Sequence, residues 1–196
     1  IGRYFTRLML LDDEVKIALV NDPAETETLI HLLKYDSVHK IFPLSYEIKG
    51  DRVVFENGKQ IYFTHEKEPN LIPWKEHEVE IVIESSGYFL TQKLAEGHLK
   101  AGAKKVIISA PSADDVVPIM TLGISSLELI RKNSIFSNAS CTTNNLAPML
   151  KVLNELMPIE SCHFSTIHSY TSDQRLHDSP HRDLRRARAA ATSIVP

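Results

Sequence analysis

The feature that most constrains the fold is an alternation of short apolar runs with longer amphipathic ones. The apolar runs are short enough to be buried strands, and they lie at Val15–Val20, Val79–Glu84 and Lys105–Ala110. Apolar residues at helical spacing flank them, over Ile1–Leu11, Ala24–Lys34 and Leu90–Ala101. Strands that alternate with helices predict an α/β fold, in which a doubly wound parallel sheet carries helices on both faces.

The carboxyl ends of the predicted strands carry small or polar residues. In doubly wound sheets, ligands bind beyond these ends. The residues there are Asn21-Asp22, Ser85-Ser86-Gly87 and Ser109-Ala110. Asp22 is the most specific of them, because a carboxylate at the end of such a strand can accept both hydroxyls of an adenine ribose. Asp22 before Pro23 is equally well read as a helix N-cap.

A β-hairpin is expected between these strands. Arg52–Phe55 and Gln60–Phe63 are both apolar enough to pair, and the four residues between them contain Asn57-Gly58. Asn-Gly is a strong signal for a tight turn that joins two antiparallel strands.

Composition excludes several classes of protein. The chain has 196 residues, 43% hydrophobic and 24% charged, which is an ordinary globular balance. The formal net charge of -3 gives no general reason to expect nucleic acid or an anionic membrane as a partner. No apolar run approaches the length of a membrane span. Two cysteines do not make a disulfide framework, so the reducing cytoplasm is the simpler compartment.

Both ends of the sequence suggest a fragment of a longer protein. The chain begins without methionine inside a helical pattern, and it ends on an apolar run at Pro196. No metal site is expected, because His177 and His181 lack a third ligand at suitable spacing.

Cys141 is the candidate nucleophile. It lies in a polar stretch, Ser137–Asn145, between a strand-like run and a helix-like run, Leu146–Met157. A thiol at or just before the first turn of a helix meets unpaired N–H groups and the positive end of the helix dipole. Its pKa falls there, so the thiolate forms near neutral pH. Cys162, with Ile159 and Phe164 as neighbours, is instead expected to be a packed structural thiol.

His168 is the candidate base. It ends a predicted strand, His163–Ser169, and a Cys–His pair would activate the thiol and move the proton of the reacting oxygen. A histidine satisfied on a sheet is the stronger interpretation from sequence alone. The basic run Arg182–Arg188 could hold phosphate, or it could be a solvated face.

Four segments resemble one known family, in order along the whole chain. They are Lys34–His39, Ala101–Pro111, Ser137–Asn144 and Asp183–Ala190. They resemble phosphorylating glyceraldehyde-3-phosphate dehydrogenases, and Ser137–Asn144 resembles the active-site signature of that family. The resemblance implies a Rossmann-type NAD-binding domain over residues 1–140, without its first strand and glycine-rich turn. The start of an α+β catalytic domain would follow over residues 141–196.

The resemblance also implies roles for individual residues. Cys141 would attack the aldehyde to give a thiohemiacetal, and His168 would take the hydroxyl proton while hydride passes to NAD. Inorganic phosphate would then release the thioester as 1,3-bisphosphoglycerate. The residues implied in substrate or phosphate binding are Ser140, Thr142, Thr171 and Arg186. Those implied in cofactor binding are Ile1, Asn21, Asp22, Lys67, Ser85, Gly87, Phe89 and Ser109.

NAD is favoured over NADP, because the carboxylate of Asp22 repels a 2′-phosphate. Ser179 is less typical of the NAD-using members, so dual use stays open. Membership implies a cytoplasmic homotetramer that acts in glycolysis. Asn145 stands where the family often has a second cysteine, so an oxidised Cys141 lacks a local disulfide partner.

Two alternatives to this activity remain from sequence. One is the paralogue that acts on erythrose 4-phosphate, which the residues Tyr170-Thr171 disfavour. The other is a non-catalytic role of the same fold, such as RNA binding through the cofactor groove, and only Arg182–Arg188 would support it. Because both ends of the domain pair are missing, we expect the isolated chain to have negligible activity.

Overall fold

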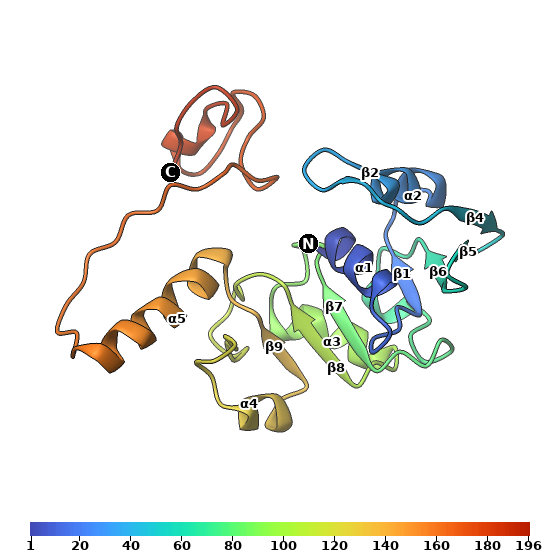
Figure 1. Cartoon of the computed structure of the whole chain (residues 1–196), viewed down its shortest axis with the longest axis horizontal. Helices are drawn as coiled ribbons and strands as arrows, with labels where there is room; N and C mark the ends of the chain where they lie inside the picture. The colour runs from blue at the N-terminus through green and yellow to red at the C-terminus, as the bar shows by residue number, and fades with distance from the viewer. The chain divides into compact units, whose positions relative to one another are not determined.

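The computed structural model describes all 196 residues and divides into two compact units, Ile1–Met157 and Pro158–Pro196. The first unit contains nearly all of the regular secondary structure, as Figure 1 shows. None of the helices has the length and apolarity that crossing a membrane requires.

A three-stranded parallel sheet forms one half of the first unit. Its strands, in spatial order, are β7 (Ile81–Glu84), β8 (Lys105–Ile108) and β9 (Ile135–Ser137). Helix α3 (Gln92–Lys100) connects β7 to β8, and α4 (Leu127–Lys132) connects β8 to β9. The three carboxyl ends therefore meet at one edge of the sheet. This confirms the predicted alternation of strands and helices, although α4 was not predicted.

A mixed sheet forms the other half. Strand β1 (Leu19–Asn21) pairs in parallel with β6 (Gln60–Thr64), and β5 (Arg52–Phe55) and β4 (Tyr46–Lys49) continue the sheet as antiparallel strands. The predicted hairpin of β5 and β6 is confirmed. Its turn places Gly58 at a φ of +82°, where a side chain would strain the backbone.

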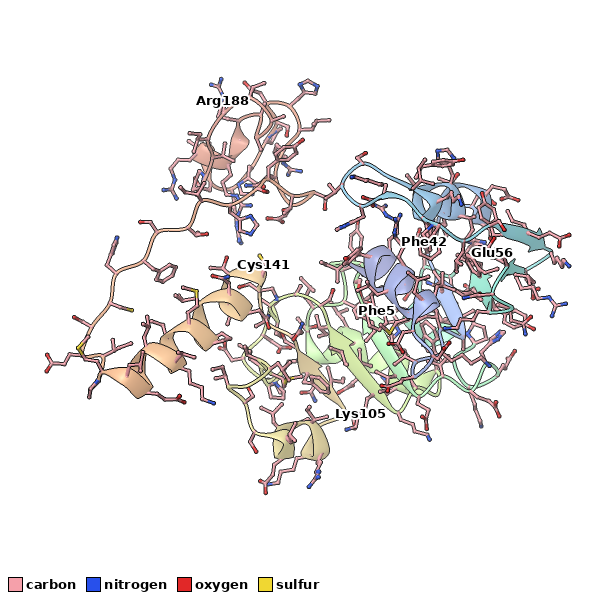
Figure 2. The ribbon with its side chains drawn as sticks, viewed as in Figure 1. Phe5, Phe42, Glu56, Lys105, Cys141 and Arg188 are labelled. Carbon is pink, nitrogen blue, oxygen red and sulfur yellow. The ribbon has the colours of Figure 1, made fainter.

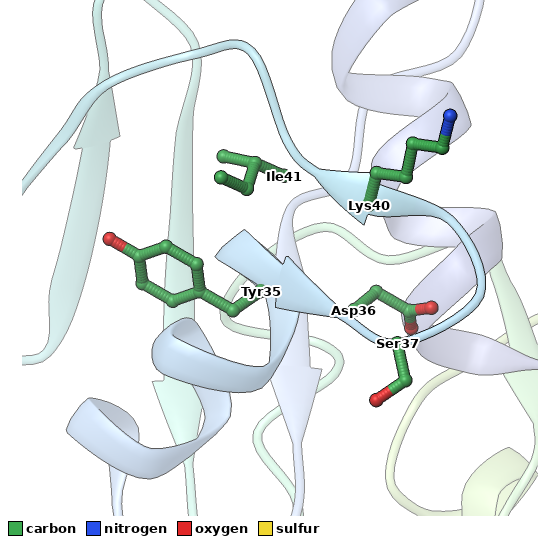
Figure 3. A pocket seen from close by; sticks show the side chains of 5 residues that line it. All are labelled: Tyr35, Asp36, Ser37, Lys40 and Ile41. Carbon is green, nitrogen blue, oxygen red and sulfur yellow. The ribbon is translucent and has the colours of Figure 1, made fainter.

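Two helices and a small ladder complete this half. Helix α1 (Gly2–Leu11) precedes β1, and α2 (Thr26–Lys34) follows it. A two-residue ladder of β2 (Tyr35–Asp36) and β3 (Lys40–Ile41) comes next, and it was not predicted. Figure 3 shows the shallow hollow that this ladder lines with Tyr35, Asp36, Ser37, Lys40 and Ile41. None of these five is a candidate site residue.

The core consists of two clusters of buried apolar side chains. One surrounds the parallel sheet, with Val82, Val106 and Ile135 from its strands and Leu19 from β1. The other lies under α1 and α2, and it contains Leu10, Ile30, Leu33, Phe42, Val53, Phe55, Ile61 and Phe63. Each such side chain contributes about 1.5–3 kcal/mol when it leaves water. Leu19 packs into the first cluster, so the mixed sheet also contributes to the core around the parallel sheet.

Helix α5 (Cys141–Leu156) ends the first unit, and it starts earlier than the predicted Leu146. None of its residues is buried. The apolar side chains of Met149, Val152, Leu153 and Leu156 are each more than half exposed. Figure 2 shows its side chains standing out around the helix, with the labelled Cys141 at its first turn.

The second unit has only one short helical turn, η2 (Leu184–Ala187). The strand predicted over His163–Ser169 is wrong, because this segment has no regular secondary structure. A strand needs a neighbour to satisfy its N–H and C=O groups, and these residues are all exposed. The packed thiol predicted at Cys162 is also wrong, because that cysteine is exposed.

Candidate active site

Cys141 is the first residue of helix α5, as its sequence context predicted. Ser140 is the N-cap, and its Oγ accepts the backbone N–H of Thr143 over 3.0 Å. The first turn contains no acidic side chain, and the thiol is exposed. The sulfur therefore lies at the positive end of the helix dipole, where an anion is stabilised.

A strained turn delivers the chain to this helix. Ala139 is buried and has a φ of +58°, a left-handed conformation that costs a non-glycine residue roughly 1–2 kcal/mol. Ser137, fully buried, donates its hydroxyl to the carbonyl of Ala110 over 2.7 Å and accepts the N–H of Ala139 over 3.0 Å. The side-chain amide of Asn144 donates to the carbonyls of Asn138 and Ser140, at 2.6 and 3.0 Å. These bonds hold the strained turn in place.

The start of α1 lies against Ser85, at the carboxyl end of β7. The hydroxyls of Ser85 and Ser109 are 3.2 Å apart. A Cβ added to Gly2 would lie 3.2 Å from the Cβ of Ser85, a tight contact that would require Ser85 to shift by a few tenths of an ångström. Ile1 is the N-cap, and it provides no side-chain hydrogen bond to the first turn of α1. Unpaired N–H groups at such a helix start favour a phosphate or another anion.

The loop after β7 contributes two further predicted residues. Gly87 has a φ of +78° and open space around its Cα, so it lets the loop turn without a side chain. Phe89 is half-buried, and its ring meets the ring of His98 edge-on with the centroids 5.8 Å apart. Phe89 is therefore part of the loop and also packs against the buried His98.

Asn21 and Asp22 play different parts at the end of β1. The N-cap of α2 is Glu25, so Asp22 is not the cap of that helix. Its carboxylate is exposed, and one oxygen accepts the N–H of Ala24 over 2.9 Å. The side-chain amide of Asn21 instead bonds both the N–H and the carbonyl of Glu66, each over 2.9 Å. This brace brings the exposed Lys67 to the same strand end as Asp22.

The second unit contains His168, Thr171 and Arg186. Nδ1 of His168 lies 2.5 Å from the carbonyl oxygen of Ser169, which can only accept, so Nδ1 donates. In the neutral imidazole, Nε2 is then the acceptor and can take a proton. The backbone N–H of Thr171 donates to the side chain of Gln174 over 2.7 Å, in an exposed turn.

The arginine-rich run is paired with carboxylates of its own unit. Arg186 binds Asp173 over 2.6 Å, and its Nε is buried without a hydrogen-bond partner. Two further pairs join Arg185 to Asp183 and Arg188 to Asp178. The side-chain hydrogen bond from Arg185, with that of its backbone N–H, lowers the pKa of Asp183 to about 2. The run is therefore a set of ion pairs rather than an open cationic patch.

The sheet edge brings together Cys141 and the predicted groove residues Ser85 and Ser109. They follow β9, β7 and β8, whose carboxyl ends are adjacent. The sequence analysis did not identify the residues that hold the turn before Cys141, which are Ser137, Ala139 and Asn144. Only their place inside a polar stretch next to the cysteine could have pointed to them.

Comparison with known proteins gives two family matches. The model "Glyceraldehyde 3-phosphate dehydrogenase, NAD binding domain" matches residues 1–92, and the model of the C-terminal domain of the same enzyme matches residues 140–196. Curated relatives named glyceraldehyde-3-phosphate dehydrogenase match the whole chain. Those of Thermotoga maritima and Geobacillus stearothermophilus are 46% and 47% identical, and the chain covers 59% and 58% of them. Glyceraldehyde-3-phosphate dehydrogenase 2 of Bacillus subtilis is 42% identical, and the chain covers 57% of it. The chain thus spans less than two thirds of these relatives, and it belongs to the glyceraldehyde-3-phosphate dehydrogenase family.

Proposed function

We propose that the protein containing this chain is an NAD-dependent, phosphorylating glyceraldehyde-3-phosphate dehydrogenase. It would convert D-glyceraldehyde 3-phosphate and inorganic phosphate to 1,3-bisphosphoglycerate. The observation that carries the proposal is the exposed thiol of Cys141 at the start of α5, beyond the carboxyl end of β9. A soft nucleophile with a lowered pKa is what aldehyde oxidation through a thioester requires.

The chain's own residues would carry most of the chemistry. Cys141 Sγ forms a bond to the carbonyl carbon of the aldehyde, and the resulting thiohemiacetal is held at the helix start. Nε2 of His168 takes the hydroxyl proton as the carbonyl re-forms. NAD, when bound, accepts the hydride that leaves the same carbon. Phosphate then attacks the thioester carbonyl, and the thiolate of Cys141 leaves as the acyl phosphate forms.

Substrate oxygens would be held by hydroxyl and guanidinium groups. Thr142 and Thr171 offer hydroxyls, and Arg186 keeps an unpartnered Nε–H beside its ion pair to Asp173. Ser140 Oγ accepts the N–H of Thr143 as the cap of α5, and its hydroxyl hydrogen would be the donor to a substrate oxygen. These four assignments follow the family resemblance.

The residues of the first unit fit a bound NAD. The helix start at Ile1 and the small side chains of Ser85 and Ser109 leave room for the pyrophosphate. Asp22, with its exposed carboxylate, suits the two hydroxyls of the adenine ribose and disfavours a 2′-phosphate. Asn21 would support Asp22 through its brace to Glu66, and Lys67 would lie near the adenine. Gly87 and Phe89 would line the cofactor groove.

The remaining features follow from family membership. We assign residues 1–140 to the NAD-binding domain and residues 141–196 to the start of the catalytic domain. We further propose a cytoplasmic homotetramer that acts in glycolysis. The paired arginines weaken the RNA-binding alternative, because aspartates neutralise three of them. Nothing in the structure favours the erythrose 4-phosphate paralogue.

Steady-state assays of the full-length protein test the proposal. Cys141→Ser should lower the rate with glyceraldehyde 3-phosphate, NAD and phosphate by at least about 10³-fold. Cys162→Ser is the matched control, since that cysteine is also exposed, and its rate should stay within about twofold. A Cys141→Ser variant with more than a tenth of the original rate would sink the mechanism. A lower KM for NADP than for NAD would overturn the role of Asp22.

A further inference from the structure

A chain of directional hydrogen bonds runs through the interior behind the loop Ser85–Phe89. Nε1–H of Trp74 donates to Nδ1 of His98 over 3.1 Å, and Nε2 of His98 lies 3.0 Å from Oε2 of Glu84. All three side chains are buried. An indole N–H can only donate, so Nδ1 accepts and the imidazole proton lies on Nε2. The indole therefore fixes the tautomer that donates to the carboxylate.

The second carboxylate oxygen continues this chain into the loop. Oε1 of Glu84 accepts the backbone N–H of Ser86 over 2.6 Å and its hydroxyl over 2.5 Å. The Oγ of Ser86 accepts in turn the N–H of Tyr88 over 3.1 Å. The turn between them is Gly87, with its positive φ. One buried carboxylate thus fixes the first half of the loop.

The far end of the loop rests on the same histidine. The rings of Phe89 and His98 form a T-shaped contact, at an interplanar angle of 90°. Both ends of the loop are therefore held by the network, one through Ser86 and the other through Phe89.

Two glycines let α3 bring His98 into this position. A Cβ on Gly97 would lie 2.9 Å from Cβ of Pro69, and one on Gly102 would lie 2.6 Å from Cβ of Lys75. Either contact is closer than side chains tolerate, so α3 could not pack this tightly with larger residues there. The segment that it packs against carries Trp74.

The ionisation state of Glu84 is consistent with its role as the acceptor of these hydrogen bonds. Burial raises its pKa, but the hydrogen bonds from His98 and Ser86 outweigh burial and hold the pKa below the ordinary value. The carboxylate is therefore ionised at neutral pH and accepts at both oxygens.

We propose that Trp74, His98 and Glu84 are positioning residues for the loop Ser85–Phe89, and that they set the affinity for NAD through Ser86. The inference rests on the proposed function, because this loop carries three of the proposed groove residues. A loop that is already fixed loses less conformational freedom when the nucleotide binds, so binding is tighter.

Ser86→Ala tests the link between network and loop in the full-length protein. It removes one donor to Glu84 and leaves the three buried side chains intact. Ser45→Ala is the matched control, since the N–H and hydroxyl of Ser45 also both donate to a carboxylate, that of Glu56. We expect Ser86→Ala to raise the Kd for NAD about three- to tenfold with kcat nearly unchanged, and Ser45→Ala to leave Kd within about twofold. Equal Kd values for the two variants would overturn the proposal.

Glu84→Gln gives a readout that does not need NAD. A glutamine amide cannot accept from both His98 and the Ser86 N–H, so the loop should loosen. Hydrogen exchange of the Ser86 and Tyr88 amides, which donate to Glu84 and to Oγ of Ser86, should speed up at least about tenfold in the free protein. Trp74 is the only tryptophan, so its emission should shift as its acceptor moves.

The two readouts separate the two proposals. If the unmodified protein does not bind NAD, the proposed function fails, and amide exchange still shows whether the network holds the loop. If exchange in the loop is unchanged in both Glu84→Gln and Ser86→Ala, the positioning role is refuted whatever the affinity for NAD.

Discussion

Replacing Ser137 with alanine tests whether the strained turn before Cys141 depends on one buried hydroxyl. Ser137 is fully buried, donates to the carbonyl of Ala110 and accepts the N–H of Ala139. Alanine fits the same space but leaves both backbone groups without their partner. An unsatisfied buried polar group costs about 1–3 kcal/mol, so two such groups give a loss of roughly 2–6 kcal/mol in the free energy of unfolding.

The assay is urea unfolding of Ser137→Ala beside Ser126→Ala. Ser126 is an exposed N-cap whose hydroxyl accepts one N–H of α4, so its loss should cost only about 1 kcal/mol. Alkylation of Cys141 by iodoacetate should also slow in Ser137→Ala, because the turn that holds the first residue of α5 in place is loosened. A loss of stability no larger than that of the Ser126 control would refute the reasoning.

Further predictions concern charge, thiol reactivity and completeness. The carboxyl carbon of Asp183 should titrate near a pKa of about 2 by NMR and return toward 3.8 in Arg185→Ala; no change between the two would disprove the ion pair. Because the pKa of Glu84 is lowered on folding, its contribution to stability is present above about 4.5 and disappears as pH falls through the folded value. The urea midpoint should therefore fall more steeply below pH 4.5 in the unmodified protein than in Glu84→Gln, and parallel curves would contradict this. Mass spectrometry should find iodoacetate on Cys141 at least about tenfold faster than on Cys162, and equal rates would argue against activation. The isolated 196-residue chain should show no turnover, which measurable product would disprove.

Elements with their own apolar periodicity were predicted well. Helix α1 and the hairpin of β5 and β6 lie where the pattern placed them, because their apolar faces and turn residues are local signals. The ladder of β2 and β3 was missed, since two-residue strands carry no period. The strand expected over His163–Ser169 is absent, because a strand needs a neighbouring strand to pair with and these exposed residues have none.

The candidate site divides in the same way. The place of Cys141 at the start of α5 was predictable, because capping chemistry at Ser140 is local. The two interpretations of Asp22 were not resolvable from sequence. The fold excludes the N-cap, because α2 begins at Thr26 and its N-cap is Glu25. The braces around the site were also invisible, since Asn21 and Glu66 are far apart in the chain and meet only when β1 pairs with β6.

The sequence alone determined the class of fold, the family and the place of Cys141 at the start of a helix, because each depends on residue order and local pattern. Tertiary structure alone decided which polar groups face one another. Nothing near Trp74, His98 or Glu84 in the chain predicts that an indole, an imidazole and a carboxylate form one buried chain of donors and acceptors. The physical reason is that a hydrogen bond requires two atoms within about 3 Å, and only the packing of α3 against β7 and the Trp74 segment sets that distance.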